Sequence, residues 1–131
     1  MTVFLAIVLT IILLSATALL ETGKRNDALQ AERTLLETRH GRIEYADWGD
    51  GRPILVLHGA GGGFDQGRLL AEAVGPDAVR WISVSRFGYL GSDLPVDPST
   101  AAQAEAFADL LDGLNLERVS VLAMSGGTPP A

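Results

Sequence analysis

The chain has 131 residues, a mass of 13.8 kDa and a formal charge of −6, which suits one domain of ordinary size. Its 47% hydrophobic content with 20% charged residues excludes a disordered, collagen-like or low-complexity protein. The acidic balance argues against a nucleic-acid partner, because such a protein carries a basic face. The absence of cysteine excludes disulfides, thiolate nucleophiles and cysteine-ligated metals. We expect neither a metal nor a cofactor.

The N-terminal segment is apolar enough to cross a membrane. Residues 2–20 contain no charged side chain, and 15 of these 19 residues are apolar. A helix of this length spans about 28 Å, close to the ~30 Å hydrocarbon core of a bilayer. We therefore expect a transmembrane helix or signal anchor over residues 1–22, with the lipid bilayer as partner. The alternative is a secreted protein whose signal is cleaved at Ala16-Thr17-Ala18, although no basic residue precedes the apolar run.

The segment that follows carries charges of both signs. Lys24 and Arg25 come directly after the apolar run, so the positive-inside rule favours a cytoplasmic C-terminal part. Leucines at three positions give a helical stripe: Leu29, Leu35 and Leu36. We expect a solvated juxtamembrane helical linker over residues 23–39, and a partner-binding helix is the alternative.

From Gly41 onward, strand patterns alternate with helical patterns. Short apolar runs predict strands that are buried on both faces. A strand–helix–strand–helix–strand order implies parallel crossovers and an α/β sheet. The turn-rich residues 47–51, with Arg42–Ala46 before them, predict a hairpin region. The buried strands are expected at 54–57, 79–84 and 119–123, and the helices at 67–74 and 100–114.

The strongest chemical motif is Ala123-Met124-Ser125-Gly126-Gly127, directly after the last apolar run. A serine on a tight strand-to-helix turn needs small neighbours, because the backbone is strained and the flanking residues pack closely. Such a turn exposes the hydroxyl group and points the next backbone N–H at the same place. The alternative is a glycine-rich loop with an incidental serine.

A second motif, His58-Gly59-Ala60-Gly61-Gly62-Gly63, follows the first buried strand. Glycines let the backbone approach a ligand and turn N–H groups toward it, so the loop could form an oxyanion hole. A dinucleotide loop fails the test, because the pattern needs glycine where Phe64 stands, and no Walker-type sequence is present. A flexible loop is the remaining alternative.

The third motif runs from Ser85 to Pro95 and follows the second buried strand. Taken alone it is a turn-rich loop. Its residues are more typical of structural than of catalytic roles, and Arg86 is expected to satisfy loop carbonyls.

Together, the three motifs resemble the α/β-hydrolase fold family. A strand ending in His58-Gly59 comes first, then Arg-x-Gly-Tyr-x-x-Ser-Asp from Arg86, then a nucleophile elbow 67 residues after His58. The resemblance covers residues 39–131 and implies the N-terminal half of a mostly parallel hydrolase sheet. We therefore assign residues 40–131 to a truncated domain that ends just after the elbow. The elbow departs from Gly-x-Ser-x-Gly in having Ala123 first.

The resemblance implies a role for individual residues. Ser125 would be the nucleophile of an esterase- or lipase-like serine hydrolase. The backbone N–H groups of Gly126 and Ala60, with help from Gly61, would bind the oxyanion, and His58 and Gly59 would shape that loop. Substrates would be small esters, amides or related acyl compounds, because epoxide and haloalkane branches use aspartate instead.

The triad order in this fold is serine, then an acid, then histidine. Only six residues follow Ser125, and both histidines, His40 and His58, precede it. We therefore expect the 131-residue chain to be an N-terminal fragment that is inactive alone, since losing one triad member costs several orders of magnitude. Residues 119–123 would then leave an exposed, aggregation-prone strand edge. The alternatives are a non-catalytic membrane-tethered binding protein and the non-functional product of a pseudogene.

Overall fold

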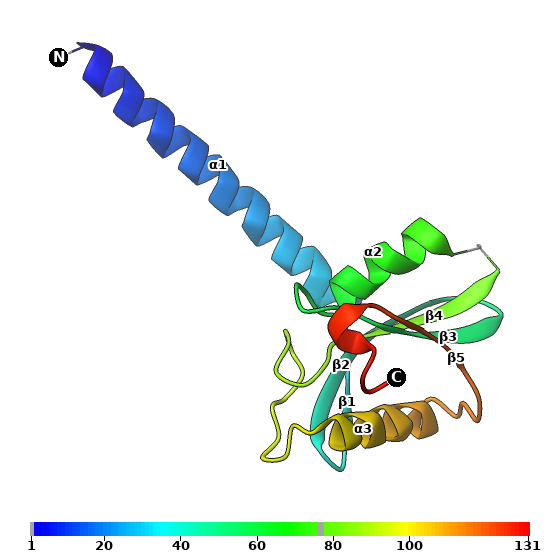
Figure 1. The fold of residues 1–131 in the computed structure, drawn as a ribbon. Helices are drawn as coiled ribbons and strands as arrows, with labels where there is room; N and C mark the ends of the chain where they lie inside the picture. Colours follow the sequence, from blue (N-terminus) through cyan, green and yellow to red (C-terminus); the bar gives the residue numbers. More distant parts are fainter. Residues whose placement is uncertain (1, 76–77) are drawn as a thin grey trace. The chain divides into compact units, whose positions relative to one another are not determined.

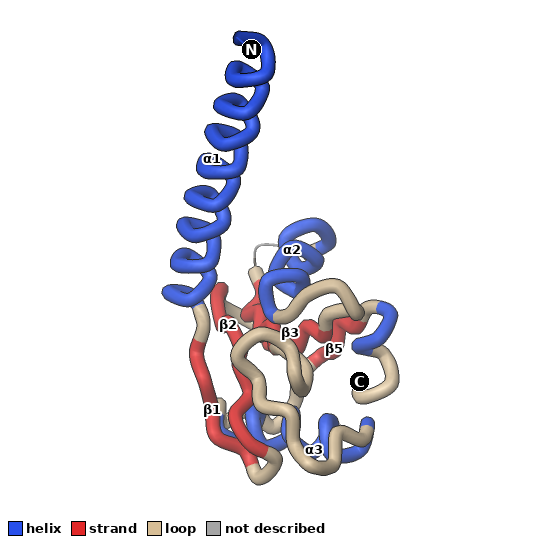
Figure 2. The backbone as a smooth tube through the Cα atoms, turned by 90° about the vertical axis from the view of Figure 1, so that its left-hand side faces the viewer, coloured by secondary structure: helices blue, strands red, loops and turns tan. Residues whose placement is uncertain are grey.

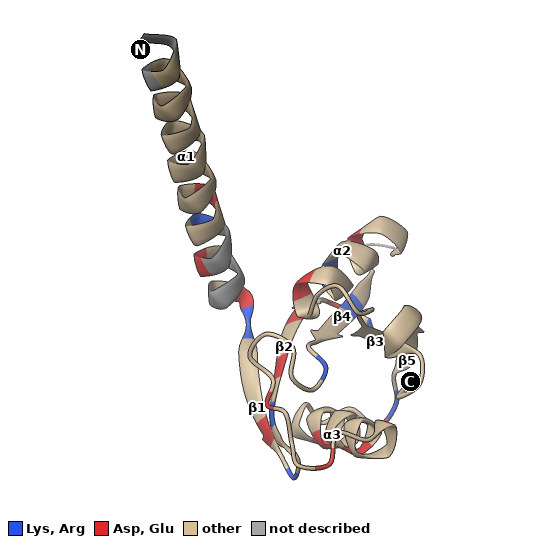
Figure 3. Ribbon diagram, turned by 60° about the vertical axis from the view of Figure 1, so that its left-hand side comes forward, with Lys and Arg blue, Asp and Glu red and all other residues tan. Residues whose placement is uncertain are grey.

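The computed structural model describes residues 2–75 and 78–131 (Figure 1). These residues divide into two compact units, which meet in the sequence after Glu32. The first unit is helix α1 (Thr2–Glu32). Within it, Ala6–Lys24 is long and apolar enough to cross a membrane, a test that a signal sequence near the N-terminus also passes. In Figure 3 the ribbon positions coloured for acidic and basic residues of this helix lie in its C-terminal half.

The second unit begins with a strand where the sequence predicted a helical linker. Residues 23–32 are helical, but β1 (Thr34–Thr38) is extended and pairs with the next strand, so the helical prediction for residues 34–38 is wrong. The spacing of the leucines does not distinguish a helix from a strand here, because Leu35 and Leu36 also fit the alternating faces of a strand. Leu36 packs into the domain core while Leu35 is exposed.

Five strands form one mixed sheet in the described part of the chain, in the order β1-β2-β4-β3-β5. The predicted parallel crossovers are confirmed: β3 lies between β4 and β5 and runs parallel to both. β1 and β2 pair antiparallel, and β2 is also antiparallel to β4. The strands are β2 (Gly41–Gly49), β3 (Arg52–Leu57), β4 (Val79–Val84) and β5 (Ser120–Ala123).

The predicted hairpin is displaced along the chain. β2 runs on through Asp47 and Trp48, and the segment after Gly49 leads to β3, which is separated from β2 by β4. The hairpin joins β1 to β2 instead, with Arg39 and His40 at its turn. The turn is held by Arg39, which donates to both Asp109 carboxylate oxygens at 2.6–3.0 Å, and this hydrogen bonding lowers the pKa of Asp109.

Helices cover opposite faces of the sheet, α2 (Phe64–Val74) on one and α3 (Thr100–Gly113) on the other (Figure 1). Because strand side chains alternate, Leu55 and Leu57 pack toward α3, and Val56 packs with Ala71 of α2. Both faces of β3 are thereby covered, which explains its unbroken apolar run. α3 begins at Ser99, whose hydroxyl accepts a hydrogen bond from the Ala102 N–H.

β5 is less buried than its apolar sequence predicted. Only β3 pairs with it among the described strands, and Val121 keeps 46% of its surface exposed. The prediction of a strand buried on both faces is therefore wrong for residues 120–121, whereas Leu122 and Ala123 are partly buried. The exposed edge that the sequence analysis expected is present in this structure.

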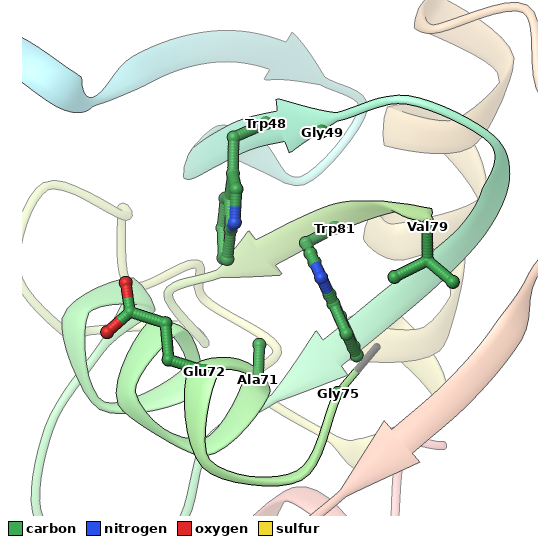
Figure 4. Close-up of a pocket in the computed structure, with 7 residues that line it drawn as sticks. All are labelled: Trp48, Gly49, Ala71, Glu72, Gly75, Val79 and Trp81. Atoms are coloured by element: carbon green, nitrogen blue, oxygen red, sulfur yellow. The ribbon is translucent and has the colours of Figure 1, made fainter. Parts of the chain in front are cut away.

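A cavity of about 220 Å³ lies between α2 and strands β2 and β4. Figure 4 shows the indole rings of Trp48 and Trp81 facing into this space, with Glu72 at the side of α2. Arg68 stacks on the Trp48 ring at 5.2 Å. Glu72 is the one ionisable side chain among its lining residues, and the lining contains no serine or histidine, so the reactive motifs lie elsewhere.

Leu110 tests the core on the α3 side, because its side chain has no exposed surface. Leu110→Ala is expected to lower the free energy of unfolding by about 2–5 kcal/mol, through lost burial and the cavity left behind. Leu69→Ala is the matched control, because Leu69 is 59% exposed on α2 and should change stability by less than about 0.5 kcal/mol. Denaturation followed by tryptophan fluorescence measures both, and equal losses would contradict this packing.

Candidate active site

The three sequence motifs meet at one edge of the sheet. His58, Ser85 and Met124 directly follow β3, β4 and β5, which are parallel and therefore end on the same side. The Met124 N–H donates to the Leu57 carbonyl at 3.0 Å, which extends the β3–β5 pairing by one residue. Figure 1 shows the short helix after β5 (η1, Ser125–Gly127) beside the loop that leads into α2. In Figure 2 the loop that leads into α2 is drawn in tan.

Ser125 lies at a sharp turn with strained backbone. Its φ is +48°, in the left-handed region that residues other than glycine seldom adopt. The turn is closed by two backbone hydrogen bonds, from Gly127 N–H to Met124 O and from Thr128 N–H to Ser125 O. The serine itself is exposed. Strain of this kind at an exposed serine between a strand and a helical turn is typical of a nucleophile elbow.

Gly127 allows the elbow to approach β3. A Cβ atom at this position would lie 2.6 Å from His58 O and 2.7 Å from Leu57 O. Both atoms belong to the backbone, so no side-chain movement would relieve the clash. Glycine at position 127, two residues after the serine, is therefore required by close packing, as the motif predicted.

The predicted oxyanion loop lies against this elbow. A Cβ built on Gly59 would lie 3.5 Å from Ser125 Cβ, and one built on Gly126 would lie 3.8 Å from Ala60 N. Gly59 N–H is occupied, because it donates to Gln66 Oε1 at 2.8 Å. Within the described residues, the N–H groups of Ala60 and Gly126 donate to no protein acceptor. Two donors thus remain free beside Ser125.

Gly61 lies farther along the same loop, beside the Gln66 amide. A Cβ on Gly61 would lie 3.2 Å from Gln66 Nε2. The contacts that reach the elbow come from Gly59 and Ala60. The assistance predicted for Gly61 remains a prediction.

His58 is completely buried and uses both ring nitrogens. Nε2 accepts the Arg86 backbone N–H at 2.9 Å, so Nδ1 carries the proton and donates to Gly59 O at 2.6 Å. Burial lowers the pKa of His58, and the hydrogen bond to Gly59 opposes this only in part. The ring is therefore neutral and has no nitrogen left to serve as a base. The loop-shaping role implied by the resemblance stays a prediction.

Arg86 and Tyr89 hold the other side of the loop. Arg86 Nη2 donates to Gly59 O at 3.1 Å, which confirms that this arginine satisfies a loop carbonyl. The guanidinium also lies 4.9 Å from the centre of the Tyr89 ring. Tyr89 packs edge-on against the His58 ring at 4.7 Å, and its hydroxyl donates to Ala60 O at 3.3 Å. The peptide units around Ala60 are thereby held from both sides.

A cavity of about 260 Å³ opens beside the elbow. It is large enough for a small acyl group and mixes apolar walls with three polar side chains, those of Arg86, Thr100 and Gln103. Gln103 is 5% exposed, and its Oε1 accepts the Phe87 N–H at 2.7 Å. The lining residues are Arg86, Phe87, Leu94, Pro98, Thr100, Gln103, Gly126, Pro129 and Pro130.

Sequence reasoning missed three polar residues that organise this edge: Glu44, Gln66 and Gln103. Each one bonds to a backbone group or side chain of a motif loop from another segment of the chain. Glu44 carried the best signal, since it stands between Ile43 and Tyr45 in an otherwise ordinary strand pattern. Nothing in that pattern shows that its carboxylate is buried.

Neither histidine of the described residues is free to serve as a base for Ser125. His58 is occupied as above, and His40 lies in the β1–β2 turn, where Nε2 is 2.9 Å from Glu105 Oε2. No group of three or more histidine, aspartate or glutamate side chains in the described ranges could hold a metal ion.

The comparisons with known proteins agree with this geometry. No family model matches the chain. The uncharacterized hydrolase YcgS of Bacillus subtilis is 34% identical over 89 residues, which is 68% of this chain and 31% of that protein. An α/β-hydrolase fold protein from Nakamurella multipartita superimposes with a TM-score of 0.70 and 37% identity, over 75% of this chain and 34% of that one. An esterase from Exiguobacterium antarcticum gives 0.63 and 26%, over 72% and 36%.

An elbow serine between a parallel strand and a helical turn, facing a His-Gly loop, defines the α/β-hydrolase architecture. The chain belongs to the α/β-hydrolase fold family, and the fold predicted from the motifs is confirmed. It spans about a third of the length of the relatives that it matches.

The neutral His58 predicts how stability depends on pH. Its pKa is lowered in the folded state and is about 6.5 in an unfolded chain. The unfolded chain therefore binds the proton more readily, so this stabilisation is present above about pH 6.5 and is lost as the pH falls below it. The denaturation midpoint should drop between pH 7.5 and 5.5, and His58→Gln should remove most of that drop.

His40→Gln is the matched control for this experiment, because it removes the other histidine of the sequence and should retain the drop. Asp93 and Asp109 also have lowered pKa values, but aspartates titrate near pH 4, below the interval measured. An unchanged pH dependence in His58→Gln would contradict a buried neutral ring.

Proposed function

We propose that this chain is the nucleophile-bearing N-terminal part of a membrane-anchored serine hydrolase that cleaves small esters or related acyl compounds. The observation that carries the proposal is Ser125 at φ +48°, with the unused N–H groups of Ala60 and Gly126 beside it. An exposed hydroxyl next to two free donors suits attack on a carbonyl carbon, with the developing oxyanion bound by those donors.

The catalytic roles follow the positions of the groups. Ser125 Oγ attacks the acyl carbon, the leaving group departs with a proton from the base, and water then hydrolyses the acyl-enzyme. Each oxyanion donor contributes about 2.7–4 kcal/mol to transition-state stabilisation in enzymes of this type. The cavity at Arg86 and Gln103 would hold the acyl group.

The acid and the base would come from further chain, as they do in the order serine, acid, histidine. His58 and His40 are both engaged elsewhere. We therefore expect residues 1–131 to lack hydrolase activity alone, because a serine without its base is a weak nucleophile.

A fluorophosphonate probe tests the nucleophile directly in the full-length protein, which supplies the acid and the base. Labelling is expected at Ser125 and should be abolished in Ser125→Ala, since the reacting oxygen is gone. Ser120→Ala is the matched control, because Ser120 lies on β5 outside the elbow and its loss should leave labelling intact. A folded protein that stays unlabelled would contradict the proposal and favour a non-catalytic, membrane-tethered binding protein.

The proposed anchor is the apolar part of α1. Ala6–Lys24 has a mean hydropathy of 2.0, and the basic Lys24 at its end favours a cytoplasmic C-terminal part. The protein is expected to stay with membranes in alkaline carbonate and to become extractable when residues 2–20 are deleted. Intact mass separates the alternative, because a chain that begins after Ala18 would show a cleaved signal and contradict the anchor.

A further inference from the structure

We infer that Glu44 is a positioning residue for the oxyanion hole, acting through the loop that follows β4; this inference rests on the proposed function. Glu44 lies on β2, outside all three motifs, and its side chain is 1% exposed. Burying a carboxylate is costly unless hydrogen bonds and a cation compensate it. Two donors from the loop that carries Arg86, together with the Arg33 guanidinium, compensate this carboxylate.

Three donors converge on the Glu44 carboxylate. Oε2 accepts the Ser85 hydroxyl at 2.7 Å and the Gly91 N–H at 3.0 Å, while Oε1 faces Arg33 Nη1 at 3.0 Å. Ser85 begins the loop and Gly91 lies six residues farther on, so a single carboxylate oxygen holds the chain on both sides of residues 86–90. A Cβ on Gly91 would lie 2.6 Å from Oε1, so a side chain at this position would displace the carboxylate.

The backbone of Glu44 reinforces the same closure. Its carbonyl accepts the Ser85 N–H at 2.8 Å, and its N–H donates to Ser92 Oγ at 2.9 Å. Ser92 Oγ in turn donates to Ser85 O at 2.6 Å. The loop is therefore closed on Glu44 by side-chain and backbone bonds together, and its conformation depends on this strand.

The loop after β4 is hydrogen-bonded to the oxyanion loop, so its conformation affects where the oxyanion loop lies. Three hydrogen bonds leave the segment between Ser85 and Gly91. The Arg86 N–H donates to His58 Nε2, the Arg86 guanidinium donates to Gly59 O, and the Tyr89 hydroxyl donates to Ala60 O. Ser85 adds a further link, because its Oγ accepts the N–H of Phe64, where α2 begins after the oxyanion loop. Glu44 thus fixes the peptide that carries the Ala60 N–H without touching the reacting atoms.

Glu44→Gln tests the inference, since the amide keeps the shape but places an NH₂ group against one of the three donors. We expect the second-order rate of Ser125 labelling by a fluorophosphonate to fall about tenfold, less than the 10²–10³ loss for a donor removed outright. Ser85→Ala is a second, milder variant that removes one link and should slow labelling in the same direction.

Asp47→Asn is the matched control. Asp47 lies on the same strand and pairs with Arg80 at 2.6 Å, away from the loop, so its loss should leave the labelling rate unchanged. The inference is overturned if Ser125 is labelled as fast in Glu44→Gln and in Ser85→Ala as it is in Asp47→Asn. If the parent protein is not labelled at all, the proposed function fails, and the positioning role is decided by amide hydrogen exchange.

Hydrogen exchange reads the positioning without requiring activity. In Glu44→Gln, amide protection should fall in residues 85–92 and also in residues 58–63, whereas a merely local role would loosen the first segment alone. Protection in residues 68–74, the later part of α2, serves as the internal reference for a folded domain. Loss confined to residues 85–92 would overturn the inference.

Discussion

The buried His58 ring joins the parts of the candidate site. It accepts the Arg86 N–H on one side and donates to Gly59 O on the other, so the loops after β3 and β4 are bonded through one imidazole. The ring can do this only while neutral, because a proton on Nε2 would oppose the Arg86 donor and burial penalises the charge. Arg86, Gly59 and Tyr89 take their positions around this link.

The parallel register of β3 with its neighbours brings the third motif to the same point. Leu57 pairs with Val84 on one side and Ala123 on the other, so the chain leaves all three strands at one level. The Met124 N–H bonds to Leu57 O, and the strained Ser125 follows at once. Positive φ at a serine is tolerated here because Gly127 lets the turn pack onto the β3 backbone.

Much of this arrangement could be predicted from local patterns, and the failures have physical causes. β3 and β4 were predictable, because burial on both faces requires an unbroken apolar run. β1 was missed because Leu35 and Leu36 fit either period, and only pairing with β2 and packing against α3 made the segment extended. Glu44 was missed because two of the three donors to its carboxylate lie 41 and 47 residues farther along the chain.

The alternation of strands and helices, the apolar N-terminal helix and the three loops that meet near Ser125 can all be read from the amino-acid sequence. These features depend on short-range periodicity and on small residues where the backbone must turn sharply. The tertiary structure alone decided which N–H groups remain free, which histidine nitrogens are occupied and which carboxylate holds the loop after β4. Those properties depend on hydrogen bonds between distant segments, and a buried polar group finds its partner only when the strands pack together.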